Sequence, residues 1–270
     1  MPYRHAHYWL LLLFPLTGLA FWPNYFSVFA TSPYAFHVHG VTASLWILML
    51  AFQSWSIHSR QNALHRTAGL SVLILLPLFT VGGVLVLQTM AVKFAASTDP
   101  LFVTFGARLG ALDFISTLAI PVLVYLALKW RRKVHLHARY LLVTVFFLIP
   151  PILSRLLPAL PPLAIEGPQH FHRFGYGVHI AIGMTILLAA FLYARAPKHG
   201  RPFLIVGSLC ALQMLIFETA ARTAWWEGLF AALASVPAPL LIGLGLAGGA
   251  LAAWLGWAAD ARREARPATA

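Results

Sequence analysis

Residues 35–66, "AFHVHGVTASLWILMLAFQSWSIHSRQNALHR", decide the fold of this chain. Between His39 and His58 the stretch contains no charged residue and only a few polar ones. An α-helix needs about 20 predominantly apolar residues to cross the hydrocarbon core of a bilayer. The stretch therefore predicts a transmembrane helix over 36–58, with histidines at both of its ends.

The same pattern recurs along the chain, which is 60% hydrophobic and only 10% charged. The apolar runs are continuous rather than alternating, so they predict helices and not the strands of a membrane barrel. The connections between the runs are too short for a separate soluble domain. We expect an all-α polytopic membrane bundle, a single domain over 1–270, with about eight transmembrane helices. The predicted spans are 8–30, 36–58, 69–92, 110–130, 140–160, 174–195, 202–222 and 238–259.

The formal net charge of +12 is distributed as a topology signal and not as a nucleic-acid-binding surface. With a cytoplasmic amino terminus, 14 of the 19 Lys and Arg residues fall on the cytoplasmic side, as the positive-inside rule requires. We therefore expect a protein of the bacterial inner membrane, surrounded by lipid, with both termini in the cytoplasm and no nucleic-acid partner. The 14 residues are Arg4, Arg60, Arg66, Lys129, Arg131, Arg132, Lys133, Arg139, Arg195, Lys198, Arg201, Arg262, Arg263 and Arg266.

Histidines occur in pairs separated by one residue more often than composition predicts. Twelve histidines in 270 residues would give roughly 0.5 such pairs by chance, whereas the sequence has four. Each pair stands at the start of a predicted span, in the first, second, fifth and sixth spans. The pairs are His5/His7, His37/His39, His135/His137 and His170/His172.

The spacing of the pairs predicts an internal duplication. His7 and His137 are 130 residues apart, and His39 and His172 are 133 residues apart. The halves would be 1–130 and 131–260. Because each half holds four spans, an even number, the two repeats would have the same orientation in the membrane.

Histidine is the main candidate ligand for a metal or haem, because Cys210 is the only cysteine of the chain. In the first hypothesis, facing helices each supply one imidazole to a b-type haem, and two haems carry electrons across the membrane. Such a protein would exchange electrons with a redox partner or a quinone. The candidate axial ligands are His7 with His137 on the cytoplasmic side and His39 with His172 on the outer side, with His179 as a deeper substitute.

In the second hypothesis a single zinc, copper or iron ion sits at the periplasmic mouth and serves a metal-dependent enzyme. A mixture of imidazole nitrogens and a carboxylate suits several of these metals. In the alternative reading the histidines anchor helix ends at the lipid interface beside aromatic residues. The candidate metal ligands are His37, His39, Glu166, His170 and His172.

Polar residues inside the spans predict a cavity, because such groups are costly in lipid and face protein or water. Glu218 and Arg222 are spaced for a local ion pair, whereas Asp113 has no obvious local partner. A third hypothesis follows, a proton-coupled carrier of a small solute in which Asp113 and His179 titrate. The candidate cavity residues are Gln53, Asp113, Arg155, Glu218 and Arg222.

Gly245 and Gly249 lie at GxxxG spacing in the last predicted span. Small residues at this spacing let two helices approach closely. We expect this face to pack against a neighbouring helix or against a second copy of the chain in a homo-oligomer.

Several residues together carry a family resemblance. His39 opens one predicted helix, Gln53 lies two-thirds along it, and "HRTAG" follows at 65–69. Further on stand "HLHARYLLV" at 135–143 and then "SRLLP". With these motifs the chain resembles, over about residues 36–160, the bacterial membrane family labelled domain of unknown function 2306.

This chain departs from the family pattern at one motif. In the family, His is followed directly by Arg, whereas in this chain Ala138 stands between His137 and Arg139. The family has no established activity. The resemblance therefore implies the membrane-helix architecture and assigns no function.

Overall fold

The computed structural model describes the backbone of residues 3–264 and the side chains of residues 3–259. Within these residues the fold is all-α, and no strand occurs. The side chains of Arg262, Arg263 and Arg266, which contribute to the predicted topology, lie outside the described residues.

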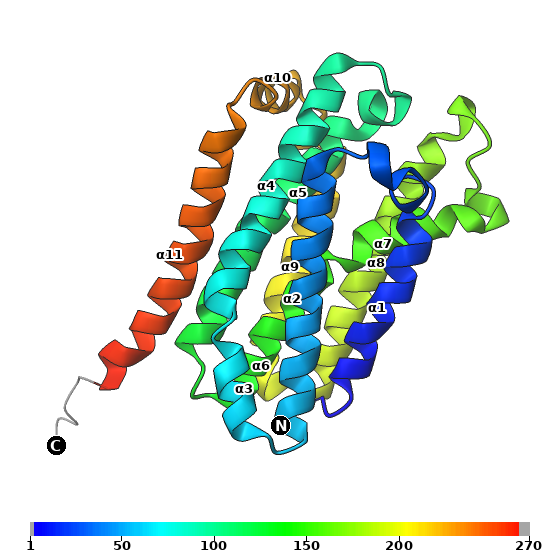
Figure 1. Ribbon diagram of the computed structural model, residues 1–270. Coiled ribbons are helices and arrows are strands. Elements are labelled where there is room, and N and C mark those ends of the chain that lie inside the picture. Colours follow the sequence, from blue (N-terminus) through cyan, green and yellow to red (C-terminus); the bar gives the residue numbers. More distant parts are fainter. Residues whose placement is uncertain (1–2, 265–270) are drawn as a thin grey trace.

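The elements follow one another as helices joined by short 3₁₀ segments (Figure 1). The α-helices are α1 Ala6–Phe21, α2 Tyr34–His58, α3 Asn62–Gly69, α4 Val72–Ala96, α5 Pro100–Lys129, α6 Val134–Leu142, α7 Ile149–Leu156, α8 His172–Arg195, α9 Arg201–Glu218, α10 Ala224–Leu233 and α11 Ala238–Glu264. The 3₁₀ segments are η1 Phe26–Thr31, η2 Val143–Phe147, η3 Leu157–Ala159, η4 Pro161–Leu163, η5 Pro168–His170, η6 Pro197–His199 and η7 Ala220–Arg222.

Seven helical segments of the described residues are long and apolar enough to cross a membrane. The chain is therefore a polytopic integral membrane protein. The seven segments are Tyr34–His58, Val72–Ala96, Pro100–Lys129, Val134–Ala159, Pro168–Arg195, Arg201–Arg222 and Ala238–Ala259.

The first predicted span, 8–30, differs from the observed structure. Helix α1 has 16 residues and ends at Phe21, and the chain continues into η1. Pro23 follows closely, and a proline has no amide hydrogen to donate to a helical carbonyl. At about 1.5 Å per residue, α1 is shorter than the other spans.

Helix α5 begins ten residues before the predicted span 110–130. Asp99 caps its amino end by accepting a hydrogen bond from the Leu101 amide at 3.0 Å, and Pro100 occupies the first turn, where no amide donor is needed. The charge of Arg108 interrupts the apolar pattern, so hydropathy alone misses this part of the helix.

The predicted span 140–160 is one crossing, but it is broken near its middle. Helix α6 gives way to the buried 3₁₀ segment η2, and α7 follows with Pro150 and Pro151 in its first turn. Prolines cannot supply the amide donors that would continue a regular helix. The broken crossing lies in the interior, since half of the Val134–Ala159 segment is buried, against 22% for Ala238–Ala259.

Helix packing places α11 at one edge of the bundle and α1 near the opposite edge (Figure 1). Helix α11 packs along α4 and α5, α2 packs on α4 and α1, and α8 packs on α9 and α7. Helices α3 and α6 lie at one end of the bundle, and α10 lies at the other end.

The glycine face of α11 packs within the chain. A Cβ atom at Gly249 would lie 2.6 Å from the Pro77 Cα atom, and one at Gly245 would lie 3.1 Å from the Val81 Cα atom. Both contacts are to α4, so this face is covered and is not open to a second copy of the chain. Oligomerisation itself stays a prediction, as does the duplication of 1–130 in 131–260.

Candidate functional site

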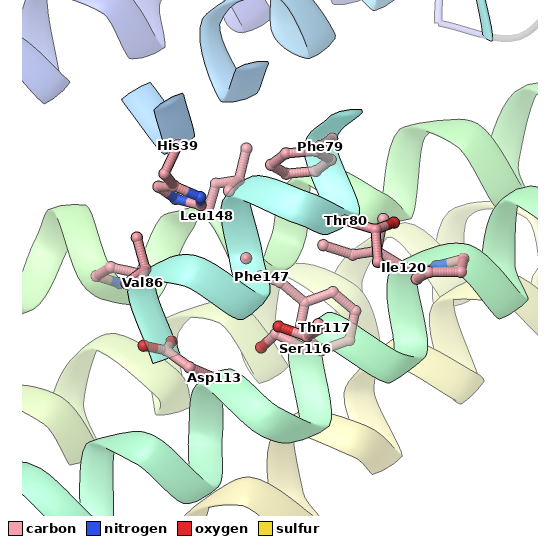
Figure 2. Close-up of a pocket in the computed structure, with 13 residues that line it drawn as sticks. His39, Phe79, Thr80, Val86, Asp113, Ser116, Thr117, Ile120, Phe147 and Leu148 are labelled. Atoms are coloured by element: carbon pink, nitrogen blue, oxygen red, sulfur yellow. The ribbon is translucent and has the colours of Figure 1, made fainter. Parts of the chain in front are cut away.

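A cavity of about 80 Å³ lies between α2, α4, α5 and the broken crossing. By the rule of roughly 10–15 Å³ per water, it has room for several waters or one small solute. Figure 2 shows His39 of α2 and Asp113 of α5 at its wall. The lining residues are His39, Phe79, Thr80, Gly83, Val86, Asp113, Ser116, Thr117, Ile120, Pro121, Phe147, Leu148 and Pro151.

His39 is held at the cavity by the close approach of α2 to α4. A Cβ atom at Gly82 would lie 3.0 Å from the His39 Cα atom and 2.6 Å from the Thr42 hydroxyl, so only a glycine allows this spacing without a shift. The imidazole faces the Phe79 ring at 6.0 Å between centroids. Its Nδ1 atom is buried and has no hydrogen-bond partner among the described residues.

Asp113 is the carboxylate of the cavity. Within the described part of the chain its side chain makes no hydrogen bond and no direct ion pair, although the Arg155 guanidinium acts on it electrostatically. Arg155 is fixed elsewhere, because it donates to the Pro151 carbonyl at 2.9 Å and lies 4.5 Å from the centroid of the Phe21 ring. The structure thus brings two predicted residues, His39 and Asp113, to one cavity, and Arg155 acts on Asp113 without lining the cavity.

The hydroxyl groups of the cavity are held by helix carbonyls. Thr80 donates to the Leu76 carbonyl at 2.9 Å, and Ser116 donates to the Leu112 carbonyl at 2.9 Å. The buried Gln213 of α9 donates to both the Ser116 hydroxyl and the Leu112 carbonyl. Sequence reasoning missed Gln213, although an amide within an apolar span is itself a signal.

Two of the predicted cavity residues, Glu218 and Arg222, belong to a separate ion cluster. The predicted pair is confirmed at 3.0 Å. Glu218 also pairs with Arg108 of α5 and lies 2.8 Å from the Nε2 atom of His179. His179 therefore has this ring nitrogen engaged by a carboxylate. Arg108 was not predicted for the site, because it falls outside the predicted span 110–130.

Gln53 is not among the residues that line this cavity. It is 14 residues along α2 from His39, roughly 21 Å at the helical rise. Its side chain is buried and its Nε2 atom has no partner among the described residues. The Nδ1 atom of His65 lies 3.2 Å from the Gln53 carbonyl, and that of His137 lies 2.9 Å from the Ala127 carbonyl.

Of the residues proposed for the outer metal site, only His170 and Glu166 are neighbours, His37 and His172 lie near other groups, and the Nδ1 atom of His39 has no hydrogen-bond partner among the described residues. His37 lies 2.9 Å from the Tyr25 hydroxyl, His170 lies 3.9 Å from Glu166, and His172 lies 3.0 Å from the Gln169 carbonyl. Among the residues that the structure describes, no group of three or more His, Cys, Asp or Glu is placed to hold a metal ion.

The haem pairs are likewise not joined by any contact in the described part of the chain. His7 packs on Tyr8 at 4.1 Å between ring centroids, and its Nδ1 atom is buried without a partner. His172 is exposed at the start of α8, which packs on α7 and α9, whereas His39 belongs to α2. Haem and metal binding stay predictions.

Comparison with known proteins adds no family. No protein-family model, curated protein sequence or solved structure matches this chain. The fold and the cavity define the class, a polytopic α-helical integral membrane protein with a polar cavity inside its bundle. The resemblance over residues 36–160 stays a prediction.

Proposed function

We propose that this protein is a proton-coupled carrier of a small polar solute, with the cavity as its binding site. The observation that carries the proposal is that His39 and Asp113 line one cavity inside the bundle, where neither the Nδ1 atom of His39 nor the Asp113 carboxylate has a hydrogen-bond partner among the described residues. Ionisable residues inside a membrane protein are costly and mark ion and solute pathways. Two such groups at one cavity can exchange a proton with a bound solute.

The broken crossing supports the same proposal. Secondary transporters bind solutes where transmembrane helices are interrupted, near the middle of the bilayer. Here η2 interrupts the crossing, and Phe147, Leu148 and Pro151 of this region line the cavity. Short 3₁₀ stretches within helices often mark hinges, so this segment would move as access to the cavity changes sides.

The test uses the purified protein in vesicles that contain a fluorescent pH indicator. Small amines, carboxylates, sugars and amides are added outside, one class at a time, and the internal pH is followed. We expect one class to drive proton movement. Asp113→Asn should abolish it, whereas Glu227→Gln, an exposed carboxylate on α10, should retain it. Proton movement that is equal in both variants would contradict the proposal.

Transmembrane electron transfer through a b-type haem is the second candidate function. It is favoured by His137, whose Nδ1 atom contacts a backbone carbonyl, since ligating imidazoles usually donate their other N–H to such a group. The absorption spectrum of the purified protein tests it: a reducible haem spectrum supports electron transfer. Bound zinc, copper or iron without haem would support the metal-dependent enzyme.

A further inference from the structure

The cavity offers hydrogen-bond acceptors and few donors. The hydroxyl protons of Thr80 and Ser116 are used on the Leu76 and Leu112 carbonyls. The Thr80 oxygen keeps both lone pairs, and the Ser116 oxygen, which accepts from Gln213, keeps one. Asp113 as a carboxylate only accepts, and a neutral imidazole at His39 supplies one accepting nitrogen and one N–H donor. The Thr117 hydroxyl has no partner among the described residues and can turn either way.

Two backbone carbonyls add to this set of acceptors. Phe147 lines the cavity, and the residues three and four positions after it are Pro150 and Pro151. Neither has an amide hydrogen, so the Phe147 carbonyl has no helical donor in either the 3₁₀ or the α pattern. Pro121 likewise removes the α-helical donor for the Thr117 carbonyl. Such carbonyls are tolerated at membrane depth where they are buried in protein or line a cavity, and both Phe147 and Thr117 are lining residues of this cavity.

The charge of the cavity is set by Asp113. Arg155 is the opposite charge that acts on it, but Arg155 does not line the cavity and its guanidinium is held by the Pro151 carbonyl. No direct ion pair joins the two in the described structure, so the carboxylate oxygens remain open to a cation. A ligand that donates hydrogen bonds and carries positive charge would satisfy them.

The remaining walls are apolar, and they favour a cation that carries an alkyl group over a hydrated metal ion. Phe79, Val86, Ile120 and Leu148 leave no polar atoms for the far side of a hydrated ion. A small alkyl group would fit against them, and its burial would be favourable.

We propose that the cavity binds a small protonated amine of the size of methylammonium or ethylammonium. The ammonium group lies against Asp113, the Thr117 hydroxyl and the Phe147 carbonyl, and the alkyl group lies against the apolar wall. This inference rests on the cavity being the solute site of the proposed function, and it names the chemical class of that solute.

The experiment measures equilibrium binding of radiolabelled methylammonium to the full-length protein in detergent. We expect saturable binding that ethylammonium displaces and that ethanol, an uncharged molecule of similar size, does not. Asp113→Asn should weaken binding about tenfold or more, because a charged hydrogen bond is lost. Glu227→Gln should bind as the unaltered chain does.

Thr117→Val and the displacement series keep the test decisive if Asp113→Asn fails to fold. Thr117→Val should also weaken binding, since it removes a hydroxyl and keeps the side-chain shape. Absence of saturable binding, equal displacement by ethanol, or displacement by Na⁺ as effective as by ethylammonium would overturn the inference.

The experiments distinguish failure of the proton-coupled carrier from failure of the amine site. Methylammonium binding without proton movement in vesicles would retain the amine site and reject the carrier. Proton movement driven by sugars or carboxylates, together with no methylammonium binding, would retain the carrier and reject the amine site.

Discussion

The two histidines of a His-x-His pair face different surroundings in this protein. His39 lines the cavity, whereas His37 contacts Tyr25. His137 reaches the Ala127 carbonyl, whereas the exposed His135 stacks on His199 at 4.8 Å between ring centroids. Residues two apart on a helix point roughly 200° from each other. The pairs therefore mark helix starts and do not form chelating units.

The ion cluster at Glu218 contains one partly buried guanidinium, that of Arg108, and one exposed guanidinium, that of Arg222. The Arg108 side chain is 16% exposed, and that of Arg222 is 60% exposed. Arg108 also donates to the Phe217 carbonyl at 3.0 Å. Arg108→Met should lower the free energy of unfolding by about 1–3 kcal/mol, and Arg222→Met by less than about 1 kcal/mol. Denaturant unfolding in detergent measures both, and equal losses would contradict this description.

His65 should make stability depend on pH. Burial lowers the pKa of this imidazole, and its bond to the Gln53 carbonyl only partly opposes the shift. The unfolded chain then binds protons more readily, so stability should fall as pH drops through about 6.5. His65→Gln should reduce the difference between the melting temperatures at pH 5 and pH 8. His172→Gln, which alters an exposed imidazole, should leave that difference as it is.

At the scale of the element, hydropathy predicts that a helix exists better than where it ends. Continuous apolar runs located seven of the eight predicted crossings, because lipid imposes length and composition on any spanning helix, whereas α1 is shorter than its predicted span. The ends depend on local groups that hydropathy does not weigh, such as Pro23 after α1 and the Asp99 cap before α5. The break at η2 was also missed, although Pro150 and Pro151 signal it.

The contact of α11 with α4 can be tested with two neighbouring glycines of α11, one at the contact and one away from it. A Cβ atom at Gly249 would meet the Pro77 backbone, whereas one at Gly248 would have nothing within 4 Å. Gly249→Ala should cost about 1–3 kcal/mol of unfolding free energy through overpacking. Gly248→Ala should be neutral or stabilise by up to about 1 kcal/mol. Thermal unfolding in detergent compares the two, and similar effects would rule out close packing at Gly249.

At the scale of the molecule, the sequence predicted where polar residues fall along their helices, but not which neighbouring helices they face. Asp113, Glu218 and Arg222 were grouped because all three fall near the same ends of their spans. In the structure Asp113 faces the cavity with His39, while Glu218 faces Arg108 and His179. Which helices are neighbours depends on tertiary packing, and a single sequence carries no record of those contacts.

The orientation of the bundle can be tested with reporter fusions. A reporter placed after Lys133, between α5 and α6, should report the cytoplasm, because basic residues concentrate at this end. A reporter inserted within 163–168 should report the periplasm. The reverse result would invert the assignment of both ends.

The place of the η2 break in the chain has a consequence for how the protein is made. Synthesis runs from the amino terminus, so α2, α4 and α5 leave the ribosome before residues 143–151. These three helices carry most of the residues that line the cavity together with Phe147. When the interrupted segment enters the membrane, these three helices have therefore already been synthesised, whereas α8 and α9, which also pack on this crossing, follow it.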